Sequence, residues 1–122
     1  MNRKVLFICL VLFTRTSNSE NFLKLSCENV ENYSTHLFKI YKNYKVVNIL
    51  PNSYEFDYQI EYEDKEKVIA YFYQKKFEKI KKFTLTFNLV ENVLYDEMHE
   101  GFEKENLTLK DKKIYKCRNI QR

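Results

Sequence analysis

Residues 54–63 alternate between apolar and polar side chains, and this pattern constrains the fold more than any other feature of the chain. The apolar set is Tyr54, Phe56, Tyr58, Ile60 and Tyr62, and each is followed by an acid or by Gln59. Because successive side chains of a strand point to opposite faces, a period of two places the whole apolar set on one face. The segment is therefore predicted to be a half-buried antiparallel strand whose aromatic face lies against the core.

Other segments also have strand character. Residues 83–89 alternate in the same way, and residues 22–27 form an apolar run suited to a first strand. Residues 67–76 fit either a helical stripe or a strand buried on both faces, and we favour the strand because it would complete a hairpin with residues 54–63. The remaining predictions are a polar break at 79–82, a loop with a helical turn over 91–105, and short strands at 106–110 and 114–117.

Residues 30–44 predict a helix. Apolar side chains recur there every three or four positions, at Val30, Tyr33, Leu37, Ile40, Tyr41 and Tyr44. Asn32 or Ser34 is suited to cap the start of such a helix. The competing interpretation is a pair of strands, because Thr, Tyr, Phe and Val disfavour helices.

These elements together predict an α+β domain. One N-terminal helix would pack on an antiparallel sheet of four or five strands and cover its aromatic face. The alternative is an all-β sandwich. A single Gly and a single Pro in the whole chain weigh against that alternative, because a sandwich needs many tight turns.

The N-terminus predicts a cleaved secretory signal peptide over residues 1–19. Arg3 and Lys4 precede the apolar run 5–13, and small residues follow, with Ser17 and Ser19 placed for cleavage after Ser19. The run is too short to cross a hydrocarbon core of about 30 Å at about 1.5 Å per residue. Residues 20–122 are therefore predicted to form a single secreted domain that is extracellular and makes no stable membrane insertion.

The cysteines and two glycosylation motifs agree with export. Cys9 leaves with the signal peptide, and Cys27 and Cys117 remain as a pair near the two ends of the domain, so we predict a disulfide between them. Closing a loop of about 90 residues stabilises a fold by about 4–5 kcal/mol in the chain-entropy model. Asn32 and Asn106 each begin an Asn-x-Ser/Thr motif and are predicted glycosylation sites.

The net charge argues against a nucleic-acid partner. The signal peptide carries three of the 21 Lys and Arg and none of the 17 Asp and Glu, so 18 basic residues face 17 acidic ones in the secreted domain. A nearly neutral domain lacks the charge excess that phosphate backbones attract. One basic run still suggests a binding patch, with the side chains Lys75, Lys76, Lys79, Lys81 and Lys82.

Catalytic motifs are scarce. The chain has only two histidines, His36 and His99, which a small hydrolase or nuclease would need to bring together as acid and base. One Gly excludes a P-loop, a dinucleotide fingerprint and a nucleophile elbow. The acidic clusters around residues 61–66 and 96–100 do not match a calcium loop. We predict no metal and no cofactor.

The sequence therefore favours a secreted, non-enzymatic binding protein that acts through protein–protein contact, as an effector, an inhibitor or a receptor ligand. Its partner would be an extracellular protein, and exposed Tyr and Phe would supply the contact. The second hypothesis is an extracellular carrier whose aromatic faces enclose a small apolar ligand. The third is the small secreted hydrolase or nuclease that uses His36 and His99.

Overall fold

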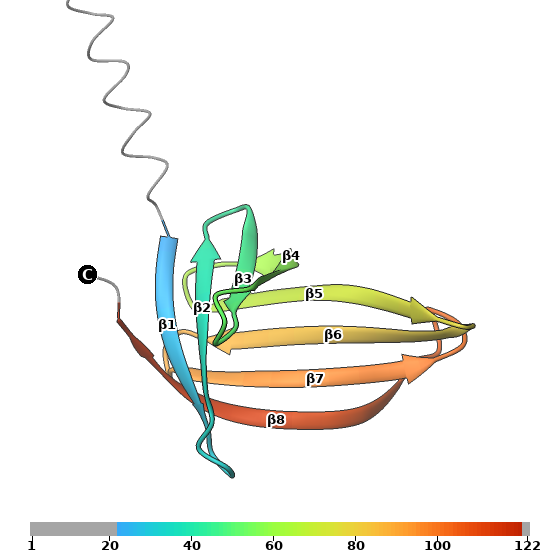
Figure 1. Ribbon diagram of the computed structural model, residues 1–122. Helices are drawn as coiled ribbons and strands as arrows, with labels where there is room; N and C mark the ends of the chain where they lie inside the picture. The colour runs from blue at the N-terminus through green and yellow to red at the C-terminus, as the bar shows by residue number, and fades with distance from the viewer. Residues whose placement is uncertain (1–21, 121–122) are drawn as a thin grey trace, which may run out of the picture.

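The strands of this protein form a closed antiparallel barrel in which every strand pairs with its neighbours in sequence and the last returns to the first (Figure 1). The computed structural model describes residues 22–120, so the predicted signal peptide over residues 1–19 lies outside the described residues. The strands are β1 (Phe22–Asn29), β2 (Thr35–Tyr41), β3 (Lys45–Ile49), β4 (Glu55–Glu63), β5 (Lys67–Lys76), β6 (Lys79–Asn88), β7 (Val93–Gly101) and β8 (Thr108–Asn119).

The predicted α+β class is wrong, because residues 22–120 contain eight strands and no helix. Residues 30–44, predicted as a helix, form a turn, β2 and a second turn. Phe38 and Ile40 of β2 point into the barrel, whereas Leu37 and Tyr41 lie on its outer face and are half-buried. Apolar side chains on both faces of one short strand produced the apparent helical spacing. The competing strand-pair interpretation is closer but not right either, because the segment contains one strand, β2, and β3 begins after it at Lys45. The all-β sandwich is also wrong, because one sheet closes on itself.

Most strands were predicted, and most of the errors lie in the turns. β5 has the predicted bounds, and β4 begins one residue later than predicted. The predicted polar break at 79–82 lies inside β6, and the predicted loop 91–105 contains β7. The two short strands predicted at 106–110 and 114–117 are one strand, β8.

Residues other than glycine make the turns. Positive φ angles occur in five of the hairpin connections, at Tyr33 (63°), Asn43 (58°), Ser53 (71°), Phe77 (62°) and Asn92 (58°). Glycine is the residue that usually takes this conformation, so its scarcity was a poor argument against an all-β fold.

Part of the barrel interior is a packed hydrophobic core. Phe38 and Phe87 meet edge to face with ring centroids 5.4 Å apart. The other buried apolar residues surround this pair: Leu25, Cys27, Ile40, Val46, Tyr58, Val68, Ala70, Leu85, Leu94 and Tyr115. Burial of these side chains stabilises the closed sheet through the hydrophobic effect.

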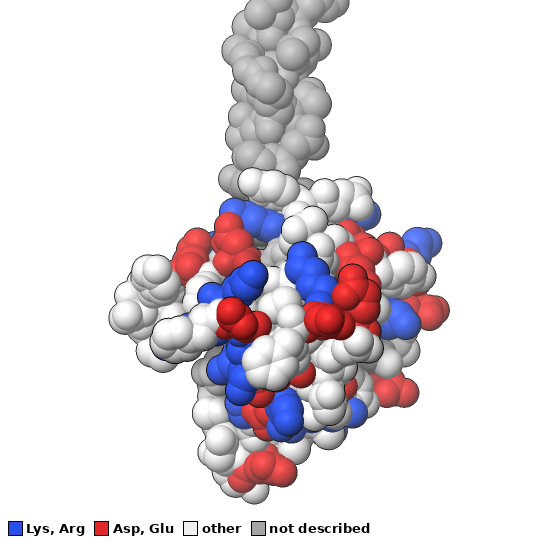
Figure 2. Space-filling view, turned by 90° about the vertical axis from the view of Figure 1, so that its right-hand side faces the viewer, with Lys and Arg blue, Asp and Glu red and all other residues white. Residues whose placement is uncertain are grey.

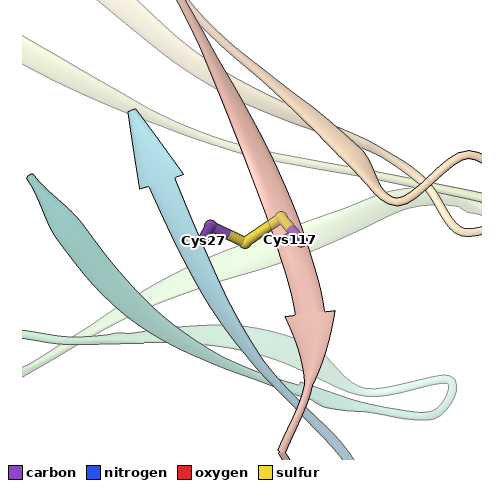
Figure 3. Close-up of a disulfide and its surroundings, with 2 residues drawn as sticks. All are labelled: Cys27 and Cys117. Carbon is purple, nitrogen blue, oxygen red and sulfur yellow. A yellow bond between two sulfur atoms is a disulfide. The ribbon is translucent and has the colours of Figure 1, made fainter. Parts of the chain in front are cut away.

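A disulfide joins the first strand to the last, as predicted. Cys27 of β1 and Cys117 of β8 lie directly opposite each other, with their Cα atoms 4.0 Å apart (Figure 3). Both side chains sit where the barrel closes. The bridge therefore reinforces the one strand pair whose members are far apart in sequence.

The strands of the second half of the chain, β5 to β8, extend past the end of the closed barrel. The β4–β5 ladder ends at the pair Gln59–Tyr71, and the β1–β8 ladder ends at Asn29–Tyr115. The β5–β6 ladder continues to Lys76–Lys79. The distal parts of β5, β6, β7 and β8 (residues 72–76, 79–83, 98–101 and 108–113) thus form a four-stranded sheet past the barrel, which we call the extension (Figure 1, right). Its inner face is continuous with the barrel interior.

Candidate binding site at the barrel mouth and the tip of the extension

The register divides the predicted basic patch between two faces of the β5–β6 hairpin. Ala70 and Leu85 pair with each other and are buried, so the residues that share their parity face inward. The inner face of the hairpin therefore has Lys76, Lys79 and Lys81. Lys75 and Lys82 lie on the outer face, where the Lys82 ammonium is 3.8 Å from a Glu61 carboxylate oxygen and 5.2 Å from the Tyr71 ring centroid.

A groove of about 670 Å³ lies on the inner face at the end of the extension. We call it the tip groove, and its lining residues are Gln74, Lys76, Phe77, Glu78, Lys79, Lys81, Glu100 and Phe102. The Lys79 ammonium is 3.5 Å from a Glu100 carboxylate oxygen across its floor. Acidic and basic side chains are interleaved around uncharged surface on this end of the molecule (Figure 2).

Phe77 is the most exposed large apolar residue among those described. It stands in the two-residue turn between β5 and β6, with φ 62° and 89% of its surface exposed. A left-handed backbone is unusual for a bulky residue and is normally occupied by Gly or Asn. The turn therefore presents an aromatic ring to solvent from a strained backbone position.

Phe102 faces the same groove from the β7–β8 loop and is 70% exposed. The loop lies close to the end of β7: a Cβ added to Gly101 would lie 2.7 Å from the Asn106 carbonyl oxygen and 3.0 Å from a Leu107 methyl carbon. The Asn106 amide also donates to the Glu103 carbonyl at 3.0 Å. Gly101 thus permits the close approach of the loop that follows it, in which Phe102 lines the same groove as Phe77.

Polar groups gather where the barrel opens onto the extension. Asp96 of β7 pairs with Leu85 on one side and Lys113 on the other, so it points inward. Asn48 of β3 and Tyr58 of β4 also face this space and are hydrogen-bonded to each other. Together with Phe56, Phe72 and Phe83, we call these residues the barrel mouth.

The electrostatics of the barrel mouth reflect partial burial. Burial is the largest cause raising the pKa of the Asp96 carboxyl; Lys113 opposes this, and Asp111 and Glu97 add to it. Burial also raises the pKa of Tyr58, and Asp96 adds to that shift. Asp96 is therefore a carboxyl group whose charge the fold does not fully compensate.

Aromatic rings form one wall of the barrel mouth. Phe72 and Phe83 stack with centroids 4.8 Å apart, and the centroids of Phe56 and Tyr58 lie 5.5 and 5.0 Å from that of Phe72. Phe56 is 44% exposed because no β5 residue pairs with its part of β4. The wall is thus open to solvent from one side.

The aromatic face of residues 54–63 is not buried as a unit, which corrects the prediction. Tyr58 is 6% exposed, but Tyr54 and Tyr62 are 62% and 47% exposed. A bulge between Ile60 and Tyr62 shifts the register, so that Tyr62 pairs with the outward Ile69. An extra residue in a strand reverses the direction of the side chains beyond it.

The two histidines lie on different faces of the barrel wall. His36 points inward and meets the Tyr115 ring edge to face at 5.3 Å. His99 pairs with the outward Lys82. Burial, followed by the charge of Lys113, lowers the pKa of His36. The described residues therefore do not bring the predicted acid–base pair together.

The two predicted glycosylation sites lie in exposed connections. Asn32 is in the β1–β2 turn, where its side-chain oxygen accepts from the Ser34 amide at 2.9 Å, and Asn106 is in the β7–β8 loop. Both positions are exposed, but glycosylation itself stays a prediction.

Across residues 22–120, no three His, Cys, Asp or Glu side chains are grouped so as to hold a metal ion. No helix within this range is long and apolar enough to cross a membrane.

Comparison with known protein families, with curated proteins and with solved structures finds no match to this chain. In the sequence, Phe77 belongs to an apolar stripe and to the basic run, and Asp96 belongs to an acidic cluster in a predicted loop, so neither is predicted as a contact residue of its own. The inward direction of Asp96 could have been predicted from the period-two pattern of β7. In this pattern Leu94, Asp96 and Met98 alternate with Tyr95 and Glu97.

Proposed function

We propose that this chain is an extracellular binding protein that acts through protein–protein contact, with the tip groove as its contact surface. The observation that carries the proposal is Phe77, a bulky aromatic side chain held at φ 62° and 89% exposed. The disulfide between Cys27 and Cys117 is compatible with an oxidising, extracellular compartment. Secretion itself rests on the predicted signal peptide.

The left-handed conformation of Phe77 lowers the stability of the free protein, and packing of its exposed ring offsets little of this loss. A non-glycine residue in the left-handed region costs about 1–2 kcal/mol, and an exposed ring gains little from packing. Gly or Asn would form the same turn with less strain. An aromatic residue that is unfavourable in the free protein is explained if a partner buries it, since buried aromatic anchors dominate binding interfaces.

The charges around the tip groove favour a partner segment that combines an apolar side chain with acids. Lys79 is paired with Glu100, whereas no carboxylate of the described residues lies within ion-pair distance of Lys76 or Lys81. Two basic groups beside two exposed rings complement such a segment.

The test is capture of extracellular partners by the tagged, secreted protein, compared between variants by quantitative mass spectrometry. Phe77→Asn retains a residue suited to the turn, and Lys76→Glu reverses one inner-face charge. Lys75→Glu is the matched control, because Lys75 is the sequence neighbour on the outer face. We expect a partner held by the wild type and by Lys75→Glu whose affinity falls at least about 30-fold with Phe77→Asn, as for a hot spot worth about 2 kcal/mol.

The proposal would be wrong if every bound protein were retained equally by Phe77→Asn and Lys76→Glu. It would also be wrong if Lys75→Glu weakened binding as much as Lys76→Glu, because the surface would then not be the inner face.

The carrier hypothesis remains a second candidate, and the barrel mouth is the observation that favours it. Leu85 and Phe87, whose strand face could have enclosed such a ligand, are instead buried in the core, where Phe87 meets Phe38 edge to face. Space for a small ligand is therefore expected at the barrel mouth and not in the core, because β-barrels commonly bind ligands at their mouths. Native mass spectrometry of the secreted protein tests this function by the presence of a bound small molecule.

A further inference from the structure

The barrel mouth contains a carboxylate without a cation. Among the described residues, no Lys, Arg or His lies within ion-pair distance of Asp96. Lys113, which is its cross-strand neighbour, instead pairs with Asp111 at 3.1 Å. A partly buried carboxylate is costly unless it is paired or hydrogen-bonded. A bound cation would remove this cost.

A second acceptor lies in the same space. The Asn48 side-chain oxygen is buried and has no hydrogen-bond donor among the described residues. The same side chain is hydrogen-bonded to Tyr58, and Tyr58 lies within electrostatic range of Asp96. The Asn48 oxygen is closed to solvent, whereas Asp96 is only half-buried, so the carboxylate is the acceptor that a ligand can reach. A primary ammonium group, which is charged and has three donors, suits this carboxylate.

The aromatic wall completes the recognition of a cation that has an apolar part. Phe72 and Phe83 are stacked at 4.8 Å, and Phe56 is exposed at the edge of the opening. Aromatic faces attract cations and cover flat apolar groups. The basic groups nearby do not favour an anion: Lys113 is paired with Asp111, and burial together with the charge of Lys113 lowers the pKa of His36, which disfavours its cationic form.

We propose that the barrel mouth is a site for a small organic amine, with the ammonium group at Asp96 and the apolar part against Phe72 and Phe83. This function goes beyond protein contact at the tip groove and uses different residues. It narrows the carrier hypothesis from an apolar ligand to a cationic one.

The experiment uses the secreted protein and three matched probes: 2-phenylethylamine, 2-phenylethanol and phenylacetate. They share the aromatic ring and differ in charge. Isothermal titration calorimetry is expected to show the amine binding with a Kd below about 1 mM. The alcohol and the acid are expected to bind at least about tenfold more weakly.

Asp96→Asn keeps the shape of the side chain and removes its charge, and it is expected to weaken amine binding at least about tenfold. Glu97→Gln is the control on the same strand, because Glu97 points to the outer face and pairs with Lys112. It is expected to leave the Kd of the amine unchanged. Circular dichroism establishes that both variants are folded.

Three results would overturn the proposal: no amine binding in the millimolar range, equal binding of amine and acid, or full affinity in Asp96→Asn. Phe77→Asn separates this site from the proposed protein contact. If the Kd of the amine for that variant equals the wild-type value, the amine site and the protein-contact surface are independent of each other.

Discussion

At the scale of single residues, Asp96 shows how a side chain can be costly to the free protein and still suit a ligand. Its carboxyl group has a raised pKa because it is withdrawn from water beside Leu85 and lacks an ion-pair partner. The neighbouring titratable groups that face it are Lys113, Asp111, Tyr58 and Tyr115. Only the Lys113 ammonium lowers the pKa, and it is shared with Asp111.

This shift predicts a pH-dependent effect of Asp96→Asn. The pKa is 3.8 in the reference state and higher in the folded protein, so the folded protein binds more protons between these two values. The free energy of unfolding of the wild type therefore falls as pH rises through this window and stays lower above it. The variant lacks this loss. We expect its stability relative to wild type to be greater at pH 7 than at about pH 3.

Urea denaturation at both pH values measures the difference. Glu97→Gln, on the outer face of the same strand, serves as the control and should show a smaller gain at pH 7, because it leaves the Asp96 carboxylate in place. A difference between Asp96→Asn and wild type that does not change with pH would contradict the argument. Combined with the calorimetry, the expected result is a variant that is more stable and binds amine less well, which is common where a site is strained for function.

At the scale of elements, the turns and loops decide what the strands present. Gly101 ends β7 where the β7–β8 loop folds back over it, and a Cβ there would lie 2.7 Å from the Asn106 carbonyl oxygen. Backbone cannot move aside as readily as a flexible side chain. The element therefore depends on the one glycine in the chain because of space and not because of a positive φ.

Gly101→Ala is accordingly expected to destabilise the protein by about 1–3 kcal/mol, as other overpacking substitutions do. The displaced loop would also move Phe102 away from the tip groove, so capture of a partner at the tip should weaken. Thermal unfolding and the capture assay check the two effects. Amine binding at the barrel mouth should be retained, and a Gly101→Ala protein as stable as wild type would show that the loop yields without cost.

At the scale of the whole molecule, closure of the barrel depends on β1 meeting β8. Five register pairs join these strands, and the disulfide lies in the middle pair. All other neighbours in the barrel are joined by a short connection, but β1 and β8 are separated by almost the whole domain. The bridge therefore acts where the loop-closure entropy is largest.

The double variant Cys27→Ala/Cys117→Ala is expected to lose about 4 kcal/mol of stability, because its unfolded chain is no longer constrained by a bridge 90 residues apart. Alanine is chosen because Cys27 is fully buried and a hydroxyl there would need a partner. Guanidinium denaturation of the oxidised wild type and the variant measures the loss. Equal midpoints would mean that the ladder alone holds the barrel closed.

The sequence by itself determined where most strands run and which cysteines pair. The alternation of β4 and β6 is a property of neighbouring residues, and so is visible without a fold. Two cysteines in the predicted secreted domain leave one possible intramolecular pair.

Only the tertiary structure decided the fold class and the site. Residues 30–44 have helical spacing, and pairing of β2 with β1 on one side and β3 on the other is what makes residues 35–41 of this segment a strand. Register between strands decides three features of the site. Asp96 points inward, Lys75 and Lys76 lie on opposite faces, and Asn48 meets Tyr58. Register is set by contacts between distant segments and by closure of the barrel, which no local pattern contains.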